Sequence, residues 1–335
     1  MSGTITQKTV AIDNLVTTTF YNIRTQIVDQ VFKIRPFYDK MIEKGRLKEK
    51  VPDGTHWEVP VRYARDNANR KWFGRGAKFG RAETETLTRL LWYRKNVGTS
   101  IVRYFDDDQK NRGKAKLIDY AKEKVNAAKM DLMEMFEEDL LVQNADALSM
   151  NALPTLISTT PTTGSIGTKT RSTNSYLQNF ASDFTGFTTG VSLQDVMTEY
   201  YNKTTEYAAE GSGASMTPDI ILTTRPVYQD IERIGRAMRT IQTSTSSRMS
   251  LGFGDIAFKN TEIFWSPYCE SGKLYLLNTG TLEFLYDPDV WFEMTAWKDE
   301  PDSLDRVAQV ICTCNMTCNQ FLKNAVIYNI ATTTS

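Results

Sequence analysis

Apolar and polar residues alternate along residues 56–64, and this period of two predicts a half-buried β-strand. Residues 86–105 are rich in Leu, Trp, Tyr, Val, Ile and Thr, so we expect a second extended stretch and, with the first, a long hairpin. The intervening residues 65–85 contain three glycines and little periodicity. A connection of about twenty such residues is uncommon in a compact domain and usually serves binding. The pattern therefore predicts a projecting loop that becomes ordered against another surface.

Residues 106–144 show apolar positions at steps of three and four, which predicts one long helix. The acidic run Asp106–Asp108 suits the positive end of the helix dipole, and capping is favoured over binding of a hard cation. The apolar stripe comprises Leu117, Ala121, Val125, Ala128, Leu132, Met135 and Phe136. The opposite face, expected to be solvated, carries Lys116, Asp119, Lys122, Glu123, Lys129 and Glu137.

The remaining segments predict an arm and a mixed α/β lobe. Within residues 1–50 we expect one or two short helices ending at Arg35 and Pro36, since the residue before proline disfavours the α conformation. Residues 155–190 are dense in Thr, Ser and Gly and predict an irregular segment with little core. Ser192 and Asp195 predict a capped helix, and a buried strand at 219–224 is expected to run into a helix starting at Pro226. Short strands are expected at 262–265, 273–278, 282–286 and 307–318, the last with its cysteines facing the core.

Length and composition narrow the class of protein. The 335 residues suggest about two lobes, and with 41 % apolar and 24 % charged residues the chain can bury a sizeable core. Lys+Arg and Asp+Glu are both 40, so a globally basic DNA-coating protein is not the first expectation. We find no apolar run of membrane-spanning length and no secretory signal, and four cysteines in such a chain predict reduced thiols in a cytosolic compartment.

Charge is balanced overall but segregated along the chain. Residues 54–105 hold eight Arg and three Lys against four acids, a local balance of +7. Residues 262–306 hold ten acids against two Lys and one Arg, a balance of −7. These segments can pair within one chain or between copies, or they can be two unrelated solvated faces.

Candidate catalytic and metal-binding patterns are weak. His56 is the only histidine, which excludes sites that need several. Cys312, Cys314 and Cys318 lie at strand spacing without a fourth clustered donor, so packing is favoured over zinc. The glycines of residues 74–80 fit no phosphate-binding pattern, and no nucleophile–base set is apparent. We therefore expect neither enzyme activity nor a cofactor. Basic residues interleaved with aromatics in 65–85 suit a protein interface, with single-stranded nucleic acid as the alternative.

Four segments resemble the major capsid protein of tailed bacteriophages. They are ALPTLISTTPTTGSIG (152–167), PDIILTTRPVYQDIE (218–232), IFWSPYCESGKLYLLNTGTLEFLYDPD (263–289) and VICTCNMTCNQFLKNAVI (310–327). The similarity in sequence covers residues from about 150 to the end, and the first 150 are similar in the order of elements. The resemblance implies an α+β capsid fold. Its parts would be an N-terminal arm (1–53), an extended hairpin loop (54–106), a peripheral domain with a long spine helix (107–150 and 290–335) and an axial domain (151–289).

The resemblance also implies a structural role. The chain would assemble with itself, as pentamers and hexamers, into an icosahedral head that encloses double-stranded DNA without reading its sequence. It would be located in the virion after assembly in the host cytoplasm, with a scaffolding protein, a portal and decoration proteins as partners and with no membrane. The loop would lie on a neighbouring subunit through Lys71, Trp72, Arg75, Lys78 and Arg81. Its acidic partner surface would comprise Asp287, Asp289, Glu293, Asp299 and Glu300. A nanocompartment shell of the same fold is the close alternative.

Overall fold

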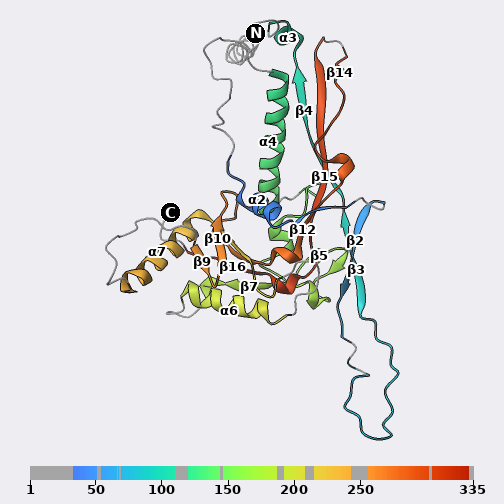
Figure 1. Cartoon of the computed structure of the whole chain (residues 1–335), viewed down its shortest axis with the longest axis vertical. Helices are drawn as coiled ribbons and strands as arrows, with labels where there is room; N and C mark the ends of the chain where they lie inside the picture. Colours follow the sequence, from blue (N-terminus) through green and yellow to red (C-terminus); the bar gives the residue numbers. More distant parts are fainter. Residues whose placement is uncertain are drawn as a thin grey trace.

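The chain is built on two six-stranded sheets joined by one long helix (Figure 1). The computed structural model describes residues 33–50, 54–65, 67, 69–110, 120–143, 146–186, 192–207, 215–242, 256–301 and 304–331. Its helices are α2 (Pro36–Glu43), α3 (Phe105–Lys110), α4 (Tyr120–Leu141), α5 (Leu153–Leu156), α6 (Leu193–Thr205) and α7 (Arg225–Gln242).

The first sheet is organised around the long strand β15. Its strands are β1 (Leu47–Glu49), β4 (Lys95–Arg103), β12 (Leu282–Tyr286), β13 (Glu293–Met294), β14 (Lys298–Asp299) and β15 (Arg306–Cys318). The full length of β4 pairs antiparallel with residues 306–314 of β15. On the other edge of β15, β12, β13 and β14 pair with successive parts of the strand. The predicted strand at 307–318 is confirmed, with all three of its cysteines buried.

The second sheet carries the helices α6 and α7 and lies at the C-terminal end of α4 (Figure 1). Its strand order is β7 (Phe180–Asp183), β16 (Ala325–Tyr328), β11 (Leu274–Leu277), β8 (Ile220–Thr223), β10 (Thr261–Trp265) and β9 (Ile256–Phe258). β8 is buried along its whole length and pairs in parallel with β10, as expected for a strand followed by a crossover helix. The predicted helix cap is also confirmed, because Ser192 and Asp195 form a reciprocal capping box on α6.

The predicted hairpin exists, but its second stretch is two strands rather than one. β2 (His56–Arg62) pairs with β3 (Leu87–Tyr93), and the chain then changes sheet at Arg94 to become β4. Nothing in the local sequence interrupts the β-propensity at this point. The break comes from tertiary pairing, since β3 follows β2 whereas β4 follows β15. The hairpin is thereby joined directly to the first sheet.

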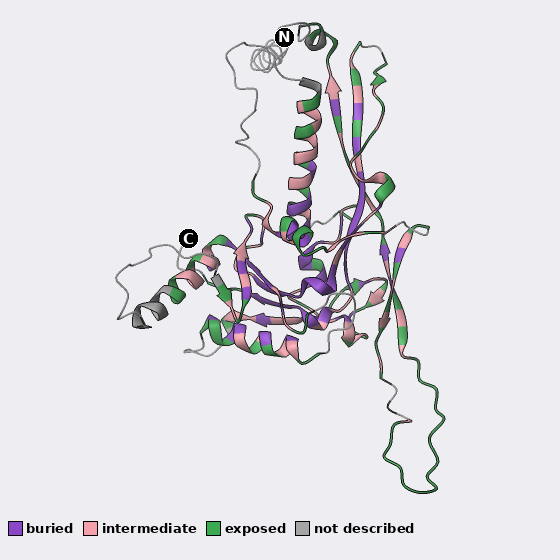
Figure 2. Ribbon diagram, viewed as in Figure 1, coloured by how far each residue is buried: buried purple, intermediate pink, exposed green. Residues whose placement is uncertain are grey.

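Helix α4 confirms four of the seven predicted stripe positions, since Val125 and Ala128 also pack partly buried against the core, and one position on each predicted face is wrong. Leu117 and the side chain of Ala121 lie outside the described residues. Leu132 and Phe136 are buried as expected, but Met135 is exposed and Glu137, expected on the solvated face, is fully buried. Figure 2 shows the buried residues concentrated where the C-terminal half of α4 meets both sheets. Residues 111–119 and 144, where the predicted helix would join α3 and end, lie outside the described residues.

The described part of the predicted N-terminal arm belongs to the core. Pro36 opens α2 rather than ending a helix, because a first-turn proline loses no helical hydrogen bond. Phe37, Tyr38 and Met41 of α2 are buried against Phe136 and the strands of the first sheet. The expected arm and its short helices are thus left to residues 1–32, which lie outside the described residues.

The crossover at 155–190 has more core than its composition predicts. Ile157, Ile166 and Leu177 are buried, and a small ribbon forms from β5 (Ser165–Ile166) and β6 (Lys169–Thr170). The buried Arg171 guanidinium donates to the carbonyls of Thr155 and Leu156 at 3.0 and 2.6 Å. The buried Arg171 thus stabilises a segment whose Thr/Ser-rich composition does not predict a core.

Candidate assembly interface

The loop between β2 and β3 ends in a clasped segment, residues 69–82, which we call the finger. Asn69 closes its base by donating to the Ala82 carbonyl (2.6 Å) and accepting from the Ala82 N–H (3.0 Å). Phe73 and Phe79 pack edge to face at 5.0 Å within it. Gly76, with φ of +84°, lies in the turn closed by the bond from the Ala77 N–H to the Gly74 carbonyl. The finger therefore has a shape of its own although it projects from the body (Figure 1).

The finger brings together all five residues predicted for the inter-subunit loop. Lys71 folds back onto the Lys78 carbonyl and lies 6.0 Å from the Phe79 ring, whereas the Trp72 side chain is fully exposed. Arg75, Lys78 and Arg81 are exposed and form no ion pair with any carboxylate of the described residues. Trp72 and three basic side chains are thus exposed and unpaired with respect to the described residues.

Of the five acids predicted to form the partner surface, four are exposed and one is buried. Asp287 is 6 % exposed and accepts from the Asp289 N–H at the start of a short turn, so its inclusion is wrong. Asp299 pairs with Arg306 at 2.9 Å on the outer end of the sheet. Asp289, Glu293 and Glu300 are exposed. Because Glu293 lies opposite Ile311 and Asp299 opposite Arg306, the acids are spread along β15 by about 17 Å.

The finger and the outer acids occupy opposite ends of the molecule. In Figure 1 the β2–β3 loop extends from one end of the fold, and β14 with the adjoining end of β15 forms the other. Pairing of the two within one chain is therefore excluded for the finger and Asp299–Glu300, and contact between copies is the remaining way to bring them together.

The base of the hairpin is fixed by contacts that the sequence pattern does not reveal. Asn315 of β15 donates to the Tyr93 carbonyl at 2.7 Å, and the Leu91 N–H donates to the Gly167 carbonyl at 3.3 Å. A Cβ atom on Gly167 would lie 2.9 Å from the Leu90 Cβ, so the β5–β6 turn touches β3 directly. These contacts fix the base of the hairpin to β15 of the first sheet and to the β5–β6 turn.

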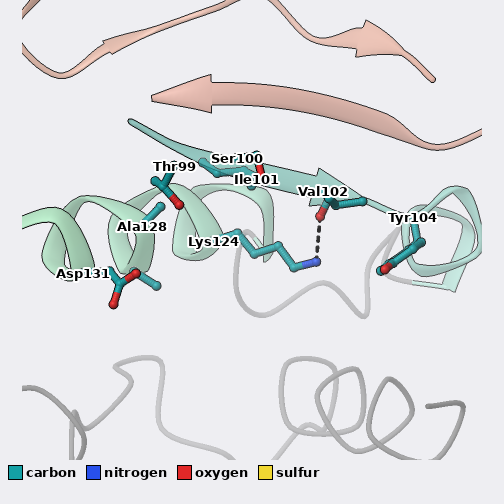
Figure 3. A pocket seen from close by; sticks show the side chains of 9 residues that line it. Thr99, Ser100, Ile101, Val102, Tyr104, Lys124, Ala128 and Asp131 are labelled. Atoms are coloured by element: carbon teal, nitrogen blue, oxygen red, sulfur yellow. Dashed lines mark hydrogen bonds between the residues drawn. The ribbon is translucent and has the colours of Figure 1, made fainter. Parts of the chain in front are cut away.

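An open cleft of about 500 Å³ lies between β4 and α4 on the first sheet (Figure 3). Thr99, Ser100, Ile101 and Val102 of β4 form one wall, and Lys124, Ala127, Ala128 and Asp131 of α4 form the other. Tyr104 closes one end, where the Lys124 ammonium lies 5.6 Å from its ring and donates to the Val102 carbonyl at 2.9 Å. No motif in the sequence identifies this cleft, because it depends on how α4 is placed beside β4.

The described residues contain no cluster suited to a metal ion and no helix long and apolar enough to cross a membrane. The four thiols are buried, and desolvation raises the pKa of Cys312 to about 11 and of Cys269 and Cys318 to about 12. Thiols in such surroundings are poor nucleophiles and poor ligands.

No protein-family model matches the chain, and no curated protein is similar to it in sequence. Solved structures are nevertheless similar over nearly the whole chain. A chain of the cyanophage A-1(L) capsid has a TM-score of 0.66 at 12 % identity, over 95 % of this chain and 99 % of that one. A chain in the capsid of an empty GTA particle has a TM-score of 0.60 at 10 % identity, over 91 % and 100 %. The SrpI encapsulin of Synechococcus elongatus PCC 7942 has a TM-score of 0.55 at 12 % identity, over 92 % and 94 %.

These similarities establish the fold. The chain has the α+β fold of tailed-phage major capsid proteins, as expected from the sequence, and the same fold is present in an encapsulin. The neighbours are structural shell proteins rather than enzymes. At identities of 10–12 % the comparison describes architecture, and the function has to be argued from this chain's own surfaces.

Proposed function

We propose that this chain is the structural subunit of an icosahedral head shell that encloses double-stranded DNA. The observation that carries the proposal is the combination of the capsid fold with the finger, in which Trp72 is exposed and Arg75, Lys78 and Arg81 form no ion pair with the described residues. In a monomer such a projection exposes apolar surface to solvent and favours aggregation, whereas in a shell it covers a neighbouring copy.

Under this proposal the parts of the chain have separate roles. The hairpin at 54–106 reaches across to a neighbour, the first sheet with α4 forms a peripheral domain, and the second sheet forms an axial domain around the five- and six-fold centres. β16 thereby joins the axial domain and β12 the peripheral one, in contrast to the bounds 290–335 and 151–289 expected from the sequence. One sequence must then form both pentamers and hexamers, so contacts must tolerate different angles between rigid cores. Long projections meet this need, since they bury area without fixing the angle, and many modest contacts add up by multivalency.

Charge supports contact between copies. Lys71, Arg75, Lys78 and Arg81 form a basic group on the finger, and Asp289, Glu293, Asp299 and Glu300 give the neighbour an acidic one. A zero net charge limits repulsion among many identical copies. A scaffolding protein, a portal and decoration proteins complete the proposed set of partners, and the chain is proposed to have no enzymatic role.

The test is the mass and shape of the purified chain, measured by light scattering and negative-stain microscopy across protein concentration, salt and crowding. Closed shells, tubes or rings of five and six copies are expected. A chain that stays monomeric or dimeric in every condition would contradict the proposal. A matched variant, Arg75→Glu/Arg81→Glu, is expected to assemble poorly and with altered sensitivity to salt, whereas Lys44→Glu, away from the finger, is expected to assemble normally.

The similarity to an encapsulin favours a second candidate, a shell that encloses protein cargo instead of DNA. Both candidates predict closed shells, so the discriminating measurement is what the shells contain when they are purified from cells. Nucleic acid in full particles together with a portal supports the phage head, and a co-purifying enzyme with little nucleic acid supports the second candidate. Binding of single-stranded nucleic acid by unassembled chains, abolished by moderate salt, would instead point to the finger as a nucleic-acid surface.

A further inference from the structure

The proposed function does not say which surface of the neighbouring copy receives the exposed indole of Trp72. The clasp between Asn69 and Ala82 and the packing of Phe73 on Phe79 give the finger a fixed shape, yet its largest side chain packs on nothing. Tryptophan and arginine dominate the residues that contribute most to binding energy when they enter a pocket on a partner. The finger therefore presents Trp72 in a way that suits insertion into a pocket on a partner.

The cleft between β4 and α4 has properties that suit this side chain. β4 pairs only with β15 among the described residues, and its central residues 96–102 contain no charge and no proline, the usual protection of an open strand edge. The wall of the cleft combines small side chains on α4 with the half-exposed ring of Tyr104. Asp131 is exposed beside it and has no hydrogen bond or ion pair within the described part of the chain.

We infer that Trp72 of one copy inserts into the β4–α4 cleft of a neighbouring copy and stacks near Tyr104, with Arg75 beside Asp131. This inference rests on the proposed function, since it names the surface that receives the finger. The occupant is a second copy because the finger and the cleft lie at opposite ends of one chain (Figure 1). A volume of about 500 Å³ holds an indole and one flanking side chain, and a basic finger complements the unpaired carboxylate.

The β4–α4 cleft lies close to the end of the first sheet that carries the exposed acids Asp299 and Glu300. Val102 and Arg103 of β4 lie opposite Val307 and Arg306 of β15, which in turn lie opposite Lys298 and Asp299 of β14. Two strand spacings of about 4.8 Å therefore separate the cleft wall from the exposed Asp299–Glu300 end. A finger seated in the cleft places its remaining basic residues within reach of these acids.

A second cleft, of about 180 Å³, is the competing receptor. It lies between α6, α7 and β9 and is lined by Met197, Ile231 and Phe258, with Gln194 at its rim. It would accept an aromatic ring, but its lining contains no acid to pair with the finger. The two clefts therefore make different predictions for where the finger can be crosslinked.

The test uses the full-length chain carrying single cysteines. Arg70→Cys lies next to the finger's Lys71 and Trp72 and replaces an exposed side chain with no hydrogen bond, ion pair or ring contact among the described residues. Ala127→Cys labels the β4–α4 cleft, and Gln194→Cys labels the competing cleft. The native thiols are buried, so a short bis-maleimide reacts with the introduced ones. Shells co-assembled from Arg70→Cys and Ala127→Cys are expected to give crosslinked dimers on a denaturing gel, and shells from Arg70→Cys and Gln194→Cys are not.

The outcomes separate this inference from the proposed function. Shells that form without a crosslink at Ala127, or that crosslink at Gln194 instead, overturn the inference and leave the shell subunit standing. A wild-type chain that forms no assembly overturns the proposed function, and the inference falls with it.

Charge exchange provides an independent measurement. Asp131→Arg is expected to lower the yield of shells at least tenfold, and combining it with Arg75→Asp is expected to restore most of that yield. Glu138→Arg is the matched control, because Glu138 is an exposed acid two turns along the same face of α4, about 10 Å from Asp131 and outside the cleft. Equal losses from Asp131→Arg and Glu138→Arg, or no rescue by Arg75→Asp, would contradict the pairing.

Discussion

The carboxylate of Glu137 accepts a 2.7 Å hydrogen bond from the backbone N–H of Tyr38, ninety-nine residues earlier in the chain. The same carboxylate accepts from the Phe37 N–H at 3.2 Å and from the Ser266 hydroxyl at 2.7 Å. It therefore acts as the N-terminal cap of α2, whose own N-cap residue Arg35 supplies no side-chain hydrogen bond. One buried side chain on α4 joins the N-terminal segment to the end of β10.

Removal of this cap is expected to weaken the fold substantially. Glu137→Ala leaves two backbone N–H groups and a hydroxyl buried without acceptors, and we expect the free energy of unfolding to fall by about 3 kcal/mol. Glu137→Gln keeps one acceptor oxygen and should lose less. Urea denaturation of the unassembled chain measures both. The exposed neighbour Glu138→Ala is the control, expected to change stability by less than about 0.5 kcal/mol, and an equally small effect of Glu137→Ala would show that the cap contributes little.

The pH dependence of stability should carry the signature of the same group. Burial raises the pKa of Glu137 above its usual 4.5, an effect that outweighs the opposing hydrogen bonds from Ser266, Tyr38 and Phe37, and nearby Asp39 raises it further. The folded chain therefore holds this proton to higher pH than the unfolded chain does. The stabilisation from the protonated group is complete below the unfolded value and is lost as pH rises through the folded pKa. Stability of wild type relative to Glu137→Gln should accordingly fall as the pH rises above 4.5, and a constant or rising difference would refute the shift.

Elements defined by local pattern could be predicted from the sequence, and those defined by tertiary pairing could not. The alternation in β15, the apolar β8 and the capping box of α6 are local signals, and all three are confirmed. The break at Arg94 has no local signal, because the residues on both sides favour a strand and only their partners differ. The helical pattern places Glu137 on the solvated face for the same reason, since only the packing of α2 against α4 makes its burial favourable.

The exposure of the finger can be predicted from the sequence, whereas the position of its proposed receptor cannot. Basic and aromatic residues in a long connection with little periodicity indicate a binding loop, and Trp72 lies exposed there. The acidic partner had only charge to support it, and charge does not distinguish Asp287, buried in a turn, from Glu293 on the surface. The β4–α4 cleft needs the relative placement of two elements, which no single segment specifies.

Gly167 provides a test of how the hairpin is anchored. It has a φ of +56°, and an added Cβ would come within 2.9 Å of the Leu90 Cβ, so Gly167→Ala combines backbone strain with a clash against β3. We expect a loss of about 2–4 kcal/mol in the free energy of unfolding. Gly164→Ala is a matched control with φ of +82° and open space around the Cβ, and it should show only the strain of about 1–2 kcal/mol. Equal losses for the two variants would mean that the contact with Leu90 is unimportant.

The cysteines should be chemically silent in the folded chain. All four are buried, and desolvation raises the pKa of Cys318 to about 12 and that of Cys314 further. At pH 8 the thiolate fraction is therefore very small, and a disulfide reagent such as DTNB should release fewer than one equivalent of chromophore per native chain. In denaturant the same chain should release four equivalents, one per cysteine. Rapid reaction of the native chain would show that β15 opens far more readily than its burial implies.

Trypsin should distinguish the free from the assembled finger. Lys71, Arg75, Lys78 and Arg81 lie exposed in an irregular segment, the kind of backbone that a protease can draw into its active site, so the unassembled chain should be cleaved there first. Covering of the finger by a neighbour removes this access, and assembled shells should lose the full-length band at least tenfold more slowly. Lys203, partly exposed within the regular helix α6 and paired with Glu199, gives a reference site whose cleavage should be slow in both states. Equal rates of cleavage at the finger in free chains and in shells would mean that the finger remains uncovered after assembly, and the contact between copies would have to be sought elsewhere on the subunit.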